Sequence, residues 1–453
     1  MNMPPHSIAK GDAPLVSAAG RFSGRSNAVG ANFAEIAYIF FLLMVFVGVT
    51  PFARPDATPG IDPASASGAG DVVRQICYLA AFGFIAGAAW MRRARLTIDA
   101  LPVLIAVLLA WCVLSAAWSL EPSVTIRRGV LLSVVAASAF IAVDTIGAPR
   151  ALQLLRYVLA AIIIVNWISI FLIPQARHFA NDLEPGVAGD WRGLYGHKNI
   201  AGAVCVNAAL IFSYFAAVTR RRGDILLALA SLVFLIGTDS KSSLGLLPVA
   251  IVAGGVYFFC AGSAINRRIV FTASLLVATV ALAALWAFWG PIAGMLQDPA
   301  LFTGRSAIWQ AELAFIRDHP ALGSGFGSFA YTGKNSPIYQ YIDSSWIGGV
   351  ASGHQGYLQL LVTIGIPGFL IAMLCLFVQP VVWFSRGSKL DLPFRSLLFA
   401  LFSFFFLHNF MESNFLNTDG PEWVTFLLVL AMLRTSREPG KAALPRSGHQ
   451  TLV

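Results

Sequence analysis

Charge is scarce in this 453-residue chain: only 12% of its residues are Asp, Glu, Lys or Arg, whereas 57% are hydrophobic. The mean hydropathy is +0.73. A soluble globule of this size needs far more polar material to cover its surface. The composition therefore excludes an ordinary soluble enzyme. It predicts an all-α polytopic membrane protein, because open sheets cannot satisfy their backbone hydrogen bonds in lipid.

Cysteine is rare as well. The five cysteines are widely spaced, lack any CxxC or Cys/His pairing, and all fall in apolar segments. This pattern predicts packing cysteines and excludes a disulfide framework or a cysteine metal site. The Gly323–Gly327 stretch has no βαβ unit around it, so we expect a turn that approaches a neighbour closely rather than a nucleotide loop. We therefore predict no cofactor and no metal.

Apolar stretches long enough to cross about 30 Å of hydrocarbon recur along most of the chain. We expect about twelve transmembrane helices, near residues 33–53, 72–91, 98–117, 128–146, 151–174, 199–218, 225–238, 242–261, 269–290, 355–384, 395–412 and 421–434. The segment at 355–384 is long enough to tilt or to break near Pro367.

The positions of Lys and Arg predict the orientation. With the N-terminus inside, the cytoplasmic side receives 20 of the 31 basic residues, including Arg220–Arg222, and 7 of the 22 acidic residues. The net charge of +9 thus indicates positive-inside topology and no nucleic-acid partner. We expect a disordered cytoplasmic N-terminus (1–31), an uncleaved first helix, a single integral membrane domain (32–434) and a cytoplasmic tail (435–453).

Polar residues near the membrane collect on the predicted outer side. One outer loop carries Arg192, His197, Lys198 and Asn199 within eight residues, which a simple interfacial belt does not require. A second, shorter turn carries Asp239 and Lys241. For that turn a capped helix start with a local ion pair is the simpler interpretation, and substrate contact is the alternative.

The large outer loop at 291–353 is the richest in polar side chains. Apolar positions at Trp309, Leu313 and Ile316, flanked by Ile308 and Phe315, predict an amphipathic helix over 306–317 that lies on the outer leaflet. Arg305 would lie at its first turn, where the exposed amides favour an anion. An arginine fork suits phosphate, although a snorkelling interfacial cation is the alternative interpretation.

His354 follows this loop at the start of the next helix. A solvent-accessible histidine that is near neutral suits a general base. Glu412 lies on the same predicted face, together with Asn409, Ser413 and Asn414. Because a charge at membrane depth is costly, we expect it to pair with an arginine or lysine of the site.

These segments together resemble the O-antigen ligase and Wzy-type polymerase superfamily, with ExoQ-type exopolysaccharide polymerases as the nearest branch. The resemblance covers about residues 100–430. It is carried by Arg192–Asn199, Gly304–Trp309, His319–Pro320 with Gly323 and Gly325, His354 with Tyr357–Leu358, and Gly365–Gly368.

The resemblance implies a metal-independent, inverting membrane glycosyltransferase at the periplasmic face of the bacterial inner membrane. It implies that the enzyme polymerises undecaprenyl-diphosphate-linked repeat units into an exopolysaccharide. Arg192 and Arg305 would bind the lipid diphosphate and His354 would serve the acceptor. Gln355 replaces the asparagine usual in the family. The expected supporting residues are His197, Lys198, Asn199, Lys241, Trp309, Gln355 and Glu412.

Expected partners are the lipid-linked glycan donor and acceptor, membrane lipid, and proteins of polysaccharide export or chain-length control. Three alternatives stay open. The first is a ligase that transfers the same donor to a lipid A core or a protein. The second is a transporter or flippase, which predicts midplane charges and broken helices. The third is a scaffolding subunit of an export complex.

Overall fold

The computed structural model describes residues 18–53, 71–93, 98–180, 186–261, 305–330, 337–341 and 353–436, together with isolated positions between 268 and 290. Within these residues every regular element is a helix, and β pairing is limited to one isolated bridge between Arg177 and Trp191. The predicted all-α class is confirmed for this part of the chain. Of the N-terminal region predicted to be disordered (1–31), residues 18–31 belong to the first helix, whereas residues 1–17 lie outside the described residues, as does most of the predicted tail (435–453).

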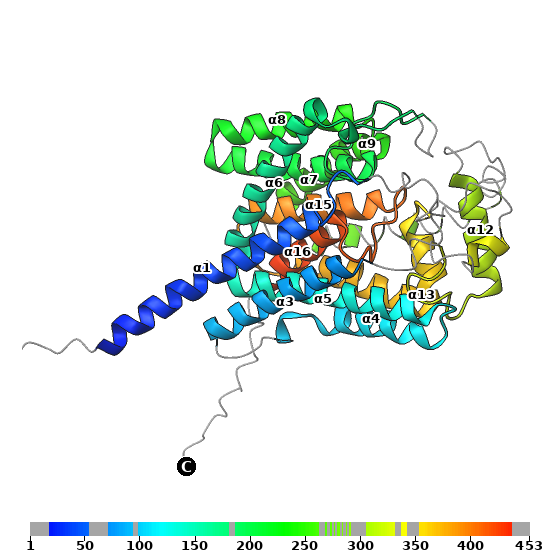
Figure 1. The fold of residues 1–453 in the computed structure, drawn as a ribbon, viewed down its shortest axis with the longest axis horizontal. Helices are drawn as coiled ribbons and strands as arrows, with labels where there is room; N and C mark the ends of the chain where they lie inside the picture. Colours follow the sequence, from blue (N-terminus) through cyan, green and yellow to red (C-terminus); the bar gives the residue numbers. More distant parts are fainter. Residues whose placement is uncertain are drawn as a thin grey trace, which may run out of the picture.

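The helices follow the predicted apolar segments, except that most of the segment at 269–290 lies outside the described residues. They are α1 (Ala18–Phe46), α3 (Val72–Arg93), α4 (Val103–Leu114), α5 (Pro122–Ile146), α6 (Ala148–Leu172), α7 (Lys198–Thr219), α8 (Arg222–Gly237), α9 (Lys241–Cys260), α12 (Arg305–Asp318), α13 (Gly356–Met373), α14 (Gln379–Ser385), α15 (Leu392–His408) and α16 (Pro421–Thr435). Figure 1 shows α12 set apart from the main bundle, next to α13.

The chain is a multi-pass membrane protein. Among the described residues, six helical segments are long and apolar enough to span a membrane: α3, α5, α6, α7, α9 and the continuous stretch Gly356–Ser385. Large apolar side chains such as Leu226, Val252 and Phe259 are exposed on the outside of the bundle, which suits contact with lipid rather than water. The expected total of twelve spans stays a prediction.

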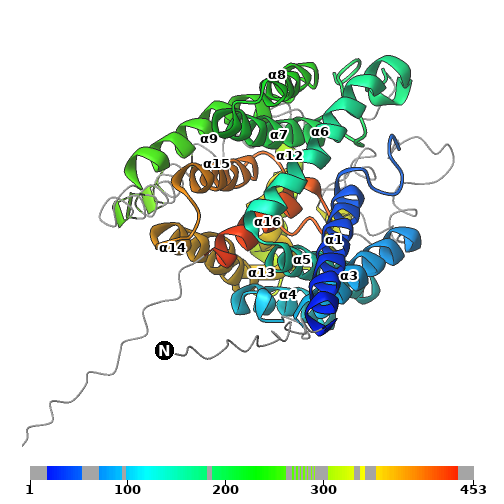
Figure 2. The same cartoon turned by 90° about the vertical axis from the view of Figure 1, so that its left-hand side faces the viewer.

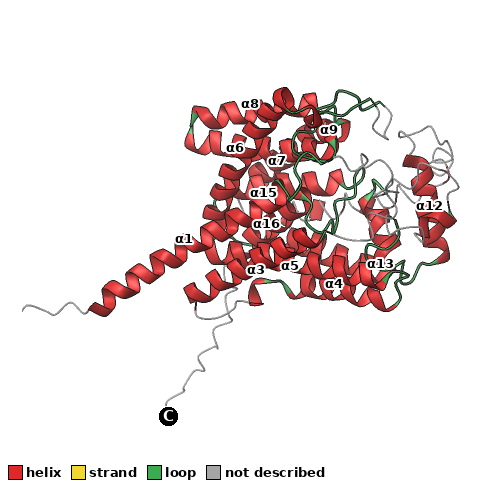
Figure 3. Cartoon of the chain, in the orientation of Figure 1, coloured by secondary structure: helices red, strands yellow, loops and turns green. Residues whose placement is uncertain are grey.

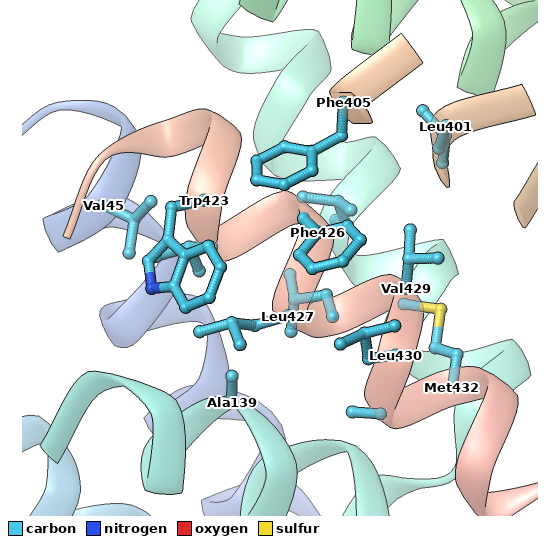
Figure 4. Close-up of a cluster of buried hydrophobic side chains, with 14 of the residues drawn as sticks. Val45, Ala139, Leu401, Phe405, Trp423, Phe426, Leu427, Val429, Leu430 and Met432 are labelled. Atoms are coloured by element: carbon cyan, nitrogen blue, oxygen red, sulfur yellow. The ribbon is translucent and has the colours of Figure 1, made fainter. Parts of the chain in front are cut away.

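The bundle is built around α16. This helix is apolar on all sides, and a helix of that kind is stable only when it is surrounded. It contacts α5, α6, α7 and α15 (Figure 2), and its residues from Trp423 to Leu433 are buried. The rings of Phe405 and Phe426 stack with centroids 4.1 Å apart (Figure 4).

The five cysteines lie in helices and are all free, as predicted.

Contacts at one end of the bundle agree with the predicted alternation of helix direction. Arg434 bonds to the carbonyl of Asp99, and Arg92 Nη1 donates to the carbonyl of Thr145 at 2.5 Å. All four residues belong to the end predicted to be cytoplasmic. The described loops concentrate at the other end, beside α12 (Figure 3). The two predicted faces are therefore separate in space, while the side of the membrane that each occupies stays a prediction.

Helix α13 is broken at Gly365, which has φ 67° and precedes Pro367 by two residues. The loop after α12 bonds to the break: Ser324 N donates to the carbonyl of Val362 at 2.8 Å, and Ile366 N donates to the carbonyl of Pro320 at 3.1 Å. The expected close approach at 323–327 is confirmed. This segment fastens α12 to the bundle.

The indole N–H groups of Trp111 and Trp118 complete this junction. They donate to the carbonyls of Ile364 and Leu322, each at 3.0 Å. Polar backbone groups freed by the break in α13 are thus bonded to protein, as a membrane protein requires.

The predicted amphipathic helix is present as α12, but its buried face differs from the expected one. The structure buries Ile308, Glu312 and Phe315 along with Trp309, whereas Leu313 and Ile316 are only half-buried. The reason is that α12 packs on α13 and its own following loop, in a cluster with Phe329 and Val362. The sequence pattern alone assigned the apolar stripe to a lipid surface.

Candidate functional site

Glu412, in the loop between α15 and α16, is the centre of the polar cluster. Its Oε1 accepts from Asn199 Nδ2 at 2.7 Å and from Arg305 Nη2 at 3.1 Å. Its Oε2 lies 3.0 Å from Nδ1 of His354. One carboxylate therefore joins three separate segments: the start of α7, the start of α12 and the turn before α13.

Arg305 occupies this place because α12 begins at it, so its side chain extends from the first turn. Nη1 donates to the carbonyl of Met411 at 2.7 Å, while Nη2 bonds to Glu412. These contacts use two of the five N–H donors of the guanidinium group. The predicted pairing of Glu412 with a cation of the site is present, and Arg305 keeps donors for a further anion.

His354 lies in a turn with left-handed backbone, at φ 50°. A non-glycine residue in that conformation is strained, and such residues are typical of functional sites. The turn is held by Trp309, whose Nε1 donates to the carbonyl of Gly353 at 2.8 Å. The His354 side chain keeps 28% of its surface exposed, so it is open to a ligand.

Gln355 has a defined role in this turn. Its Oε1 accepts from the backbone N of Leu358 at 2.6 Å, which caps the N-terminus of α13. Its own backbone N donates to Oγ of Ser413 at 3.0 Å. The longer amide side chain therefore fixes the direction of α13 directly after His354.

The sequence placed Asn409 and Asn414 on the face of Glu412, but it did not reveal their hydrogen bonds or the part played by His408. The carbonyl of Asn409 accepts from Gly356 N at 2.8 Å, and its Oδ1 accepts from the backbone N of Asn414 at 2.9 Å. His408 is buried between Oγ of Ser243, at 3.2 Å, and Nδ2 of Asn414, at 2.8 Å. A histidine at the end of a run of phenylalanines was the available signal, because a buried imidazole needs partners.

The electrostatics of Glu412 follow from these partners. Burial by itself disfavours its charged form, but the hydrogen bond and charge of His354, together with the charge of Arg305, outweigh burial and lower the pKa of Glu412 to about 2. The carboxylate is therefore ionised at neutral pH and can only accept hydrogen bonds. Nδ1 of His354 therefore donates to this carboxylate, and the lone pair that can accept a proton from a substrate is the one on Nε2.

Asn199, His197 and Lys198 lie together at the start of α7. Nδ1 of His197 accepts from Asn199 N at 3.2 Å, so His197 caps the helix that presents the Asn199 amide to Glu412. Nζ of Lys198 lies 2.6 Å from Oδ2 of Asp190 and 3.9 Å from Oδ2 of Asp239. Asp239 thus faces Lys198 rather than forming the expected local pair with Lys241. Lys241 is exposed at the first residue of α9.

Arg192 is placed differently from Arg305. It is 1% exposed, and its guanidinium group donates to the carbonyls of Gln175 at 2.7 Å, Gly196 at 2.9 Å and Ala53 at 3.3 Å. These bonds fix the loop that leads into α7. The predicted contact of Arg192 with a diphosphate stays a prediction, and its described partners are backbone carbonyls.

No group of three or more His, Cys, Asp and Glu side chains in the described part of the chain could hold a metal ion. The acidic and imidazole groups of the cluster are instead paired with each other and with Arg305. Metal-independent chemistry stays a prediction.

Comparison with known proteins gives a family match over part of the chain. The family model described as O-antigen ligase matches residues 202–373, a range that contains Arg305, Trp309, His354 and Gln355. No curated protein matches the chain. Nearness to ExoQ-type polymerases stays a prediction. Over residues 202–373 the chain is therefore similar to the O-antigen ligase family.

Proposed function

We propose that this protein is a glycosyltransferase that polymerises undecaprenyl-diphosphate-linked repeat units into an exopolysaccharide at the periplasmic face of the bacterial inner membrane. The observation that supports this most is the contact of one carboxylate, Glu412, with both His354 and Arg305. A base and an anion-binding cation are then adjacent, as transfer of a glycan from a lipid diphosphate requires.

In the proposed reaction His354 is the general base. Glu412 holds Nδ1–H, so Nε2 accepts the proton of a hydroxyl group on the acceptor sugar. That oxygen forms a bond to the anomeric carbon of the donor glycan as the bond from this carbon to the diphosphate oxygen breaks. The lipid diphosphate leaves with the electron pair. Direct displacement inverts the anomeric configuration.

Arg305 stabilises the charge that develops on the leaving diphosphate. Its fork geometry allows two parallel, charge-assisted hydrogen bonds, and such fixed donors can take the role that a divalent metal has in many glycosyltransferases. Lys198, whose Nζ lies 2.6 Å from Oδ2 of Asp190, and the exposed Lys241 are proposed to assist in holding the anion. For Arg192 we retain diphosphate binding only as a hypothesis, because its described donors bind carbonyls.

The test is reconstitution in liposomes with a defined lipid-diphosphate oligosaccharide in chelator-treated buffer. The intact protein is expected to form polymer without added metal, and His354→Ala is expected to lose about 100-fold or more of the rate. His319→Ala is the matched control, because that histidine is exposed and stacks on Phe315 away from Glu412. Full activity of His354→Ala would remove the proposed base.

A ligase reaction is the second candidate, favoured by the description of the matching family as O-antigen ligase. The donor chemistry is the same and only the acceptor differs. Supplying the donor together with either a second lipid-linked repeat unit or a lipid A core separates the two: polymer with the first acceptor supports the polymerase, and product with the second alone supports the ligase.

The transporter alternative is less well supported. It predicts broken helices around a binding site at the midplane. Helix α13 is broken, but the freed backbone groups bond to the loop after α12 and to Trp111. A transporter would also carry charges at the midplane. The buried ion pair of Arg156 and Asp224, with Nε and Oδ1 2.6 Å apart, lies instead at the start of α8, directly after Arg220–Arg222, which is the end predicted to be cytoplasmic.

A further inference from the structure

Glu312 is a buried acid that the proposed chemistry does not use. It is 1% exposed, and neither carboxyl oxygen has a hydrogen-bond partner among the residues that the structure describes. Buried carboxyl groups are ordinarily hydrogen-bonded, because an unpaired one costs free energy. A leucine would fill the same space without that cost, so packing alone does not explain an acid at this position.

Glu312 contacts the residue that precedes His354. A Cβ atom on Gly353 would overlap the Glu312 carboxyl group, so a larger residue there would require the buried Glu312 side chain to shift. The carbonyl of Gly353 accepts from Nε1 of Trp309 at 2.8 Å, and its N donates to Oε1 of Gln359 at 3.3 Å. The backbone leading into His354 is therefore held on three sides, and Glu312 provides the side without a hydrogen bond.

One face of α12 supports His354 in two ways, through the partner of its ring and through the glycine that precedes it. Arg305, Trp309 and Glu312 are separated by four and three residues, which places them on the same side of a helix. Arg305 bonds to Glu412, the partner of the His354 ring. Trp309 and Glu312 contact the glycine before it. A change in this contact surface therefore moves the imidazole relative to its carboxylate.

The protonation state of Glu312 follows from its surroundings. Burial raises the pKa of Glu312 to about 8. On its own helix the charged groups are Arg305, already bonded to Glu412, and Arg317 and Asp318 at the exposed end. His354 follows Gly353, and the titratable group of α13 is Tyr357, whose hydroxyl donates to the carbonyl of Phe406. The acid is thus uncharged at neutral pH, and an anion in its place would lack a bonded cation.

We propose that Glu312 is a positioning residue for His354, which as a neutral acid supports the turn at Gly353 and on losing its proton displaces that turn and slows glycosyl transfer. This inference rests on the proposed function, in which His354 is the base. The proposal predicts that the transfer rate falls at alkaline pH because Glu312, in α12, loses its proton. This fall does not depend on the His354 imidazole.

The first test compares pH–rate profiles of the reconstituted wild type, Glu312→Gln and Asp318→Asn. Above pH 8 the wild-type rate is expected to fall about tenfold per pH unit, as for loss of one essential proton. Glu312→Gln is expected to retain neutral-pH activity to within about threefold and to lose this decline. Asp318 is an exposed acid on the same helix, so Asp318→Asn is expected to keep the wild-type decline. An unchanged alkaline decline in Glu312→Gln would overturn the proposal.

The second test does not depend on catalysis. Because the pKa of Glu312 is raised in the folded protein, its contribution to stability is complete below about pH 4.5 and is lost as the pH rises through about 8. The Tm of the detergent-solubilised wild type is expected to fall relative to that of Glu312→Gln between pH 5 and 8. Above pH 8 the difference between the two Tm values is expected to stay constant. Parallel curves over the whole range would overturn the proposal. The expected Tm difference without any transfer activity would instead refute the proposed function, and the positioning role with it.

Discussion

Nδ1 of His354 lies 3.0 Å from Oε2 of Glu412, and the two residues are 58 positions apart in the chain. An ionised carboxylate in this place selects one imidazole tautomer and favours the imidazolium that forms when the ring accepts a proton. The same carboxylate binds Arg305 and Asn199, so the orientation of the proposed base depends on α7, α12 and the loop after α15 together.

Replacing Glu412 by Gln tests this arrangement. The amide keeps the shape and removes the negative charge, so His354 loses its charged partner and Arg305 loses its ion pair. We expect about a 100-fold loss in kcat with a smaller change in KM, because the lost interaction strengthens in the transition state. Single-turnover kinetics with the defined donor measure this. A variant with the wild-type rate would show that the tautomer of His354 is set in another way.

Arg305→Lys separates charge from fork geometry. Lysine keeps the positive charge but cannot donate two parallel hydrogen bonds, and it cannot bond the Met411 carbonyl and Glu412 in the same way. We expect polymer formation to fall about tenfold or more, with normal membrane insertion. Arg317→Lys, on the exposed end of the same helix, is the control. Equal polymerisation by both variants would contradict bidentate recognition of the diphosphate by Arg305.

Arg192→Lys distinguishes a structural role from a substrate role. Lysine cannot reproduce the described bonds to three backbone carbonyls, and hydrogen bonds of a charged group contribute about 1.5–3 kcal/mol each. We expect a lower Tm in detergent for Arg192→Lys than for Arg177→Lys, whose side chain is exposed in the same loop. An unchanged Tm together with lost donor binding would support diphosphate recognition by Arg192, as the family resemblance implies.

Gly365→Ala tests the junction between α13 and the loop after α12. Alanine at φ 67° costs about 1–2 kcal/mol in any setting, and here its Cβ would also overlap the carbonyl of Ala321. Gly48→Ala is matched in backbone, at φ 72°, and has open space around it. We expect Gly365→Ala to lower the Tm of the solubilised protein well beyond Gly48→Ala. Equal effects would mean that the close approach contributes nothing to stability.

Much of the fold could be predicted from the sequence, because the requirements of lipid are local. A stretch such as 128–146 must be helical to satisfy its own backbone, and it is. The helix at Arg305 was likewise predictable from its apolar spacing. Its buried face was not, because that face is set by Val362 and Phe329, which no periodicity within α12 reveals.

The candidate site divides in the same way. His354, Arg305 and Glu412 could be selected from the sequence because polar and ionisable residues beside apolar helices are costly and rare. The burial of Arg192 among carbonyls could not be predicted, since its partners lie in three separate segments. The part played by His408 and the hydrogen-bond partners of Asn409 could not be predicted for the same reason.

The sequence by itself determined that this chain is a helical membrane protein with its polar chemistry in the loops at one predicted face, because hydrophobicity, span length and charge distribution act residue by residue. Only the tertiary structure decided which cation and which imidazole share the Glu412 carboxylate, and that an unpaired acid lies beneath Gly353. Hydrogen bonds and burial depend on distances between segments remote in sequence, and those distances are fixed only when the helices pack.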